Sequence, residues 1–138
     1  ESGNVLLTGA EKTELGILVF DVTTAPSGFV AENADVVAKF LAVTADANTA
    51  WNATQPDFML NMIAADSGMS VADTASTMST FVFPDVDTQL SGKWLGGASQ
   101  TFMKGVADVF VNAGSIDSAK GSYEDNVNVG PLKAAKGM

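Results

Sequence analysis

The sequence predicts an α/β domain that is mostly helical, with two short strands at its N-terminus. Apolar runs at residues 5–7 and 15–24 have the length and composition of strands. From residue 34 onward, apolar residues recur at three- and four-residue spacing, as they do on one face of a helix. Hydrophobic residues make up 46% of the 138 residues, which fits a folded domain rather than a disordered chain.

The first expected strand is Val5-Leu6-Leu7, followed by a turn over residues 10–13. The second lies within residues 14–26, which read ELGILVFDVTTAP, and it is apolar on both faces, as in a sheet that is covered on both sides. Two strands alone make a marginal sheet, so we expect neighbouring strands that this chain does not supply. Asp21 lies inside the second run, and an unpaired buried carboxylate is costly. Asp21 is therefore either the exit residue of the strand or a residue whose partner lies elsewhere.

The remaining elements are expected to be helices. The apolar spacing and the capping residues place them over residues 34–52, 56–67, 70–78, 85–95 and 100–113. Their expected N-caps are Asn33, Ser70 with Asp73, and Asp85. Gly96-Gly97 is expected to break the chain between helices, and the tail from Lys133 is expected to be frayed.

Composition excludes several classes of function. The net charge is −9, from 16 acidic residues and seven scattered lysines, so nucleic acid is not an expected partner. The chain has neither His nor Cys, which removes the usual zinc sites and every His-based catalytic triad. We expect no enzyme activity, no metal and no cofactor. The chain does not begin with Met, and we interpret it as a mature or truncated form.

Several segments, in order along the chain, resemble one known family. They read VLLTG at residues 5–9, ELGILVFDVTTAPSGFVAENADVVAKFL at 14–41, FVFPDVDTQLSGKWLGG at 81–97 and TFMKGVADVFVNAGSID at 101–117. Together they resemble the C-terminal portion of periplasmic solute-binding proteins of taurine-type ABC importers, in the nitrate, sulfonate and taurine group. The resemblance covers essentially the whole chain and depends on the ordered set rather than on one motif.

The resemblance implies a two-lobed α/β fold of the type 2 periplasmic-binding-protein class, with ligand held between the lobes. Residues 1–25 would form the end of the second lobe and a strand that crosses the hinge. Residues 26–138 would form the C-terminal helical part of the first lobe and its rim, without the N-terminal half. The implied ligand is taurine or another small sulfonate or amino acid, the implied partner is an ABC permease of the inner membrane, and the implied location is the periplasm.

The resemblance also implies three ligand-binding residues. An acid of the hinge strand contacts the ligand's ammonium group in taurine-binding relatives, and the matching residue here is Asp21. Phe20 would line the pocket beside it, and Thr23 follows on the same strand. The residues alone also allow simpler interpretations, in which Asp21 bonds local backbone, Phe20 packs in the core and Thr23 leads into a turn. Trp51 and Trp94 are expected to pack within the core or rim.

Two other classes of function stay open at this point. Enzymes of thiamine-precursor synthesis share the implied architecture, but they need His or Cys chemistry that this portion lacks. A self-contained helical interaction domain would instead be a stable monomer with its strands satisfied internally. We expect the chain to expose apolar surface and to self-associate, by strand pairing or by exchange between copies.

Overall fold

The computed structural model describes residues 4–17 and 19–138, and the described residues are helical and irregular only. About 60% of the chain is helix, and none of the described residues belongs to a β-strand. The predicted α/β class with two N-terminal strands is therefore wrong, and so is the two-lobed periplasmic-binding-protein fold that the resemblance implied. Leu18, within the second expected strand, lies outside the described residues.

The first helix occupies the place where a turn was expected. Helix α1 (Gly9–Glu14) begins at a capping box, in which Thr8 Oγ1 accepts from Glu11 N at 3.2 Å. The Glu11 carboxylate accepts in return from Thr8 N at 2.7 Å. Hydrogen bonds from the Thr8 hydroxyl and then from its backbone N–H lower the pKa of Glu11. The segment before it, Val5-Leu6-Leu7, forms no strand, and Leu6 is 93% exposed.

The second expected strand fails because Gly16 ends α1 instead of continuing an extended run. Gly16 has φ +73°, the left-handed conformation that glycine adopts at little cost. Ile17 N then donates to Lys12 O at 2.9 Å, the bond of a Schellman C-cap. Residues 19–26 are irregular and do not pair with another described segment, so Val19 and Val22 stay exposed.

The helical part of the prediction is largely confirmed. The observed helices after α1 are α2 (Ser27–Glu32), α3 (Ala34–Thr54), α4 (Asp57–Ser67), α5 (Val71–Met78), α6 (Val86–Leu90), α7 (Ala98–Asn112) and α8 (Gly130–Ala135), with a 3-10 turn at Glu124–Asn126. The helix expected over residues 85–95 ends early, at Leu90. The second half of α8, from Lys133 to Ala135, lies in the tail that was expected to be frayed.

Two of the three expected N-caps form. Ser70 Oγ accepts from Asp73 N at 3.1 Å at the start of α5, and Asp85 Oδ1 accepts from Thr88 N at 2.7 Å at the start of α6. Asn33 does not cap α3, because its side-chain amide donates to Phe29 O, at 3.1 Å, in the preceding helix.

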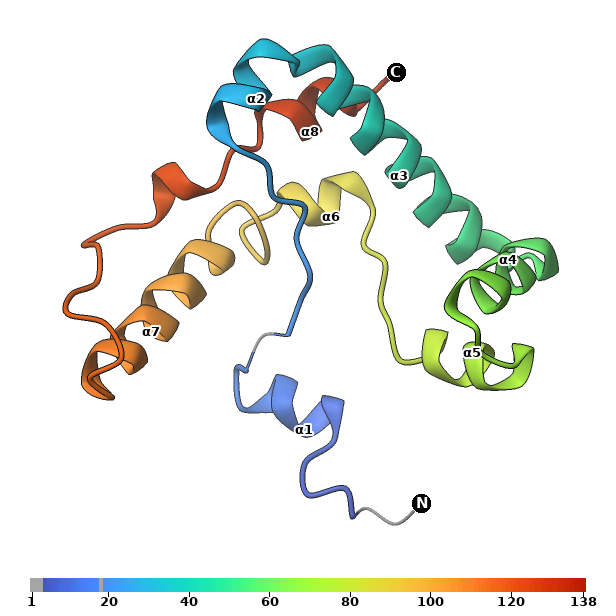
Figure 1. Cartoon of the computed structure of the whole chain (residues 1–138), viewed down its shortest axis with the longest axis horizontal. Helices are drawn as coiled ribbons and strands as arrows, with labels where there is room; N and C mark the ends of the chain where they lie inside the picture. The colour runs from blue at the N-terminus through green and yellow to red at the C-terminus, as the bar shows by residue number, and fades with distance from the viewer. Residues whose placement is uncertain (1–3, 18) are drawn as a thin grey trace.

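The best-packed part of the chain is the junction of α3 with α8, which we call the apex (Figure 1). Ala38 of α3 and Leu132 and Ala135 of α8 are all buried there. Pro131 lies in the first turn of α8, where the missing N–H of proline costs nothing. The next residue after the helix, Lys136, makes an ion pair with Asp87 of α6, so the C-terminal segment is tied to the rest of the chain.

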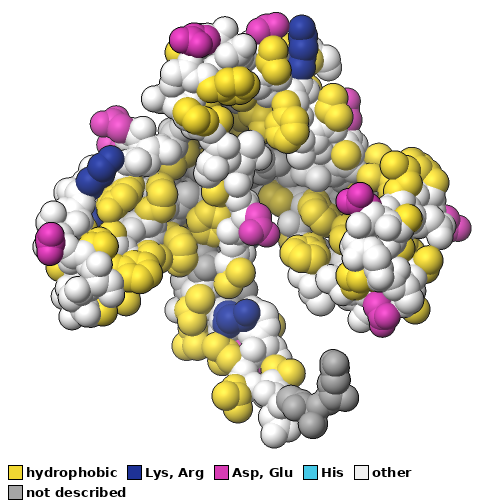
Figure 2. All heavy atoms as spheres, in the orientation of Figure 1, with side chains coloured by type: hydrophobic (Ala, Val, Ile, Leu, Met, Phe, Trp, Pro, Cys, Tyr) yellow, Lys and Arg dark blue, Asp and Glu magenta, His cyan; other side chains and the backbone are white. Residues whose placement is uncertain are grey.

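Away from the apex the arrangement is open. Helix α7, the α3–α4–α5 segment and the N-terminal segment with α1 project from it in three directions (Figure 1). The accessible surface is 9883 Å² for a mass of 14.2 kDa, whereas a compact monomer of that mass has about 6,800 Å². Hydrophobic side chains show on all three projections in Figure 2. The chain therefore leaves much apolar surface uncovered.

Candidate functional site

Phe20, Trp94 and Phe102 form an aromatic cluster from three separate parts of the chain. The Phe20 ring lies 5.9 Å from the Trp94 ring and 5.4 Å from the Phe102 ring, centroid to centroid, and both pairs are edge-to-face. Each of the three residues is half-buried. This contact holds the irregular N-terminal segment against α7 and the loop that precedes it.

A tight loop between α6 and α7 positions Trp94. Leu95 N donates to Gln89 O at 3.0 Å, and Gly96 N donates to Ser91 O at 2.9 Å. A Cβ atom on Gly96 would lie 2.7 Å from the carbonyl oxygen of Leu90, so this close backbone approach requires glycine. The expected break at Gly96-Gly97 is confirmed.

The three residues predicted to bind ligand are only partly brought together. Phe20 joins the aromatic cluster, whereas Asp21 and Thr23 are exposed on the same irregular segment. Within residues 4–17 and 19–138, no group donates a hydrogen bond to the Asp21 carboxylate or forms an ion pair with it. Asp21 is thus an uncompensated carboxylate next in sequence to an aromatic cluster, and its contact with a ligand stays a prediction.

One exposed donor for an anionic group lies next in sequence to this cluster: Lys93 precedes Trp94 and forms no ion pair among the described residues. The N-terminus of α7 adjoins Trp94, but Ala98 N already donates to Gly92 O, and Ser99 N to Trp94 O, both at 3.0 Å. Lys104, on the same helix as Phe102, is paired with Asp108 at 2.5 Å. The exposed carboxylate of Asp21 therefore suits a cation, whereas Lys93, on the Trp94 side of the cluster, suits an anion.

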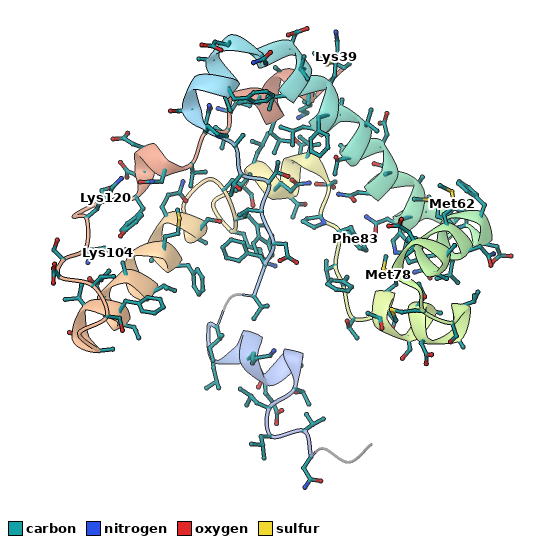
Figure 3. The ribbon with its side chains drawn as sticks, viewed as in Figure 1. Lys39, Met62, Met78, Phe83, Lys104 and Lys120 are labelled. Carbon is teal, nitrogen blue, oxygen red and sulfur yellow. The ribbon has the colours of Figure 1, made fainter. Side chains whose placement is uncertain are left out.

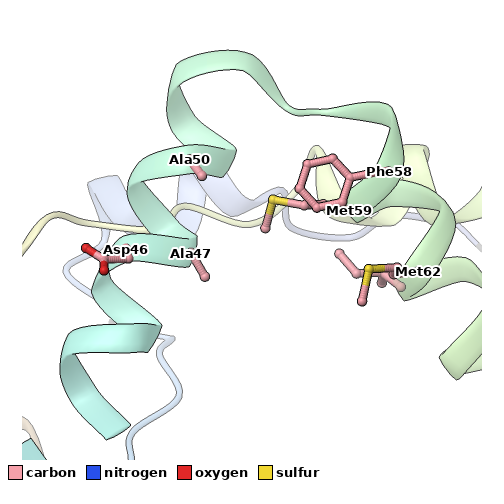
Figure 4. A pocket seen from close by; sticks show the side chains of 7 residues that line it. Asp46, Ala47, Ala50, Phe58, Met59 and Met62 are labelled. Atoms are coloured by element: carbon pink, nitrogen blue, oxygen red, sulfur yellow. The ribbon is translucent and has the colours of Figure 1, made fainter. Parts of the chain in front are cut away.

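A second candidate site, which the sequence did not predict, lies between α3 and α4. We call it the α3–α4 groove. It has a volume of about 420 Å³ and its lining is Asp46, Ala47, Ala50, Phe58, Met59, Met62 and Ile63. Figure 4 shows Ala47 and Ala50 of α3 on the side toward Phe58, Met59 and Met62 of α4, with the Asp46 carboxylate pointing away from α4. The apolar spacing of both helices predicted an inward stripe, yet Phe58 and Met62 are 64% and 66% exposed.

A smaller cavity continues the groove toward the segment after α5. It has a volume of about 140 Å³, shares Ala47, Met59 and Ile63 with the groove, and is also lined by Asn48, Trp51, Met78 and Phe83. The Trp51 and Phe83 rings meet edge-to-face at 6.3 Å. Beside them, Asn52 Nδ2 donates to Phe83 O at 2.7 Å. Met62, Met78 and Phe83 lie in this part of the molecule in Figure 3.

Within the part of the chain that the structure describes, no cluster of three or more acidic residues has the geometry to hold a metal ion. No described helix has both the length and the apolarity needed to span a membrane. Comparison of the chain with protein-family models, with curated proteins and with solved structures gives no match. The resemblance to taurine-type binding proteins therefore stands on the ordered sequence segments alone.

Proposed function

We propose that this chain belongs to the solute-binding component of an ABC importer and takes part in binding taurine or a related small sulfonate or amino acid. The observation that carries the proposal is the exposed, uncompensated carboxylate of Asp21 next to the aromatic cluster. A carboxylate holds an ammonium group through charge-assisted hydrogen bonds, and an aromatic face attracts the same cation. Asp21 would bind the ligand's ammonium group, with Phe20 beside it and Thr23 nearby on the same segment.

Only the cationic end of the ligand is assigned to this chain. The described residues do not form the two lobes that the resemblance implied, and the backbone N–H groups of Ala98 and Ser99 already have acceptors. Lys93, or groups outside the described residues, would hold the sulfonate or carboxylate end. On the same basis we propose a periplasmic location and delivery of the ligand to an ABC permease of the inner membrane.

Calorimetry of the full-length protein with taurine tests this proposal. Loss of a hydrogen bond to a charged group costs about 1.5–3 kcal/mol, so Asp21→Ala is expected to weaken binding by at least about tenfold. Asp66→Ala is the matched control, because Asp66 is another exposed acid without an ion pair among the described residues. Equal affinity of wild type and Asp21→Ala would remove Asp21 from the site, and absence of binding to taurine, other sulfonates and amino acids would overturn the function.

A second candidate function, a helical interaction protein, is favoured by a different observation. The accessible surface exceeds that of a compact monomer by roughly 3,000 Å², and large apolar side chains occupy part of it. A standard protein interface buries about 800 Å² on each partner, so the excess surface of this chain is large enough to form one. Light scattering that finds a clean monomer across a wide concentration range would count against self-association. The thiamine-precursor enzyme has no comparable support, because the chain lacks His and Cys.

A further inference from the structure

The α3–α4 groove is an apolar surface between two neighbouring helices. Six of its seven lining residues are apolar, and the one charged residue, Asp46, lies at its α3 wall (Figure 4). With the adjoining cavity it forms one elongated surface, because the two share Ala47, Met59 and Ile63. Its shape is that of a channel between two helices rather than an enclosed pocket for a small molecule.

The side chains on this surface suit a helical ligand. Met59 and Met62 come from α4 and Met78 from α5. Methionine is unbranched and polarizable, so a methionine-rich groove adapts to the apolar face of a bound helix. Helices recognised in this way place apolar residues on one face, at three- and four-residue spacing, into the groove.

The charge around the groove selects among such helices. Residues 40–92, which include the second half of α3 and all of α4, α5 and α6, contain no lysine or arginine. The same stretch contains four acids on α3, α4 and α5, namely Asp46, Asp57, Asp66 and Asp73; its other two, Asp85 and Asp87, belong to α6, where Asp87 pairs with Lys136. The part of the α3–α4–α5 segment that holds α4 and α5, which we call the α4–α5 projection, displays acidic and hydrophobic side chains and no lysine in Figure 2. An apolar groove on an acidic support complements a basic amphipathic partner.

We propose that the α3–α4 groove is a docking site for a basic amphipathic helix of a partner protein. The apolar face of that helix covers Phe58, Met59 and Met62, and its lysines or arginines meet the acidic surroundings. This inference is independent of ligand binding at Asp21, because the groove and the aromatic cluster share no residue.

Charge disfavours the two occupants that this chain itself offers. A second copy carries the same net charge of −9, so its approach to an acidic projection is repulsive. The N-terminal segment is apolar and exposed, but its helix α1 carries one basic residue, Lys12, against Glu11 and Glu14. The test described below distinguishes a second copy and the N-terminal segment from a partner helix.

The test uses three synthetic peptides of equal length and the full chain. The first contains leucine and lysine arranged to give an amphipathic helix, the second replaces lysine with glutamate, and the third is a scrambled form of the first without an apolar face. Binding is measured by fluorescence in a Trp94→Phe background, in which Trp51 beside the groove is the only tryptophan left. The leucine–lysine peptide is expected to bind more weakly as salt rises, because screening reduces its attraction to the acidic residues.

Two matched variants locate the binding surface. Met62→Lys places a charge within the groove, and Val109→Lys places the same charge on α7, at a position of nearly equal exposure (66% against 65%). Met62→Lys is expected to weaken binding of the leucine–lysine peptide by about tenfold or more, and Val109→Lys by less than about twofold. Circular dichroism of each free variant confirms that its helix content is unchanged.

Selective binding of the leucine–lysine peptide, lost in Met62→Lys and kept in Val109→Lys, supports the proposal. Equal binding of the glutamate peptide or of the scrambled peptide would overturn the preference for a basic amphipathic helix. Equal loss in the two variants would remove binding from the groove. Self-association that Met62→Lys abolishes, without peptide binding, would assign the groove to a second copy. Peptide binding that appears only after residues 1–17 are deleted would assign it to the N-terminal segment.

Discussion

The apex and the α4–α5 projection are held together in different ways. At the apex, α3 packs against α8, a helix about eighty positions further along the chain, and buries Ala38, Leu132 and Ala135. In the projection, α4 packs against α5, its neighbour in sequence, and only Ala64 and Thr74 are buried. Packing between distant helices therefore stabilises the first region, whereas caps, contacts between neighbouring helices and the contacts of Trp51 and Asn52 with Phe83 stabilise the second. The second region also carries the α3–α4 groove.

The largest expected effect is at the apex. Leu132→Ala removes a buried side chain that α8 packs against α3, and is expected to lower the free energy of unfolding by about 2–5 kcal/mol. Met62→Ala is the control in the projection, because the Met62 side chain is exposed, and it is expected to change stability by at most about 0.5 kcal/mol. Urea denaturation followed by far-ultraviolet circular dichroism measures both. Similar losses in the two variants would mean that the apex is not the more cooperative region.

A smaller and local effect is expected in the projection. Ser70→Ala removes the hydroxyl that accepts from Asp73 N at the start of α5, at a cost of about 1 kcal/mol. Hydrogen exchange is expected to accelerate in α5 and not at the apex, because the two regions have separate supports. Ser79→Ala, at the other end of α5, serves as the control substitution. Faster exchange throughout the chain would show that the projection and the apex unfold as one unit.

The smallest expected effect is a pH dependence at α6, which lies between the two regions. The hydrogen bond from Thr88 N lowers the pKa of Asp85, so its stabilising effect is present above the ordinary aspartate pKa and is lost as pH falls through the lowered value. The Thr88 amide shift, followed by NMR, is expected to titrate below the ordinary aspartate pKa. In Asp85→Asn, which caps without titrating, that transition should disappear. A Thr88 transition that persists in this variant would assign it to another group.

Local signals predicted the middle of the fold well. The Ser70 and Asp85 caps and the helical spacing of residues 34–52 act within one or two turns of a helix, and the structure contains each of them. The capping box at Thr8 and Glu11 is an equally local signal, but the apolar run before it was interpreted as a strand. An apolar run of that length has no periodicity that separates a strand from exposed irregular chain.

Features that depend on distant contacts were out of reach of the sequence. Helix α8 has only six residues, too few to show a helical periodicity. Its two buried residues, Leu132 and Ala135, are stabilised by packing on α3, which the sequence near them does not reveal. The α3–α4 groove depends on the angle at Gln55, whose φ of 43° is unusual for a residue other than glycine. Phe20 was proposed as a site residue through the family resemblance, but nothing near it in the sequence indicated that Trp94 and Phe102 contact its ring.

The hydrogen bond from Asn52 to Phe83 joins positions 31 apart and has a consequence for how this chain can change in evolution. The bond brings the two ends of the segment that contains α4 and α5 together. The positions of α3 and of the chain after Phe83 therefore do not depend on the length of that segment. Segments whose ends meet tolerate insertion, shortening and replacement better than segments that bridge distant points. Related chains can therefore change length most readily in the turn between α4 and α5, while the residues of the apex and those that line the α3–α4 groove stay constrained.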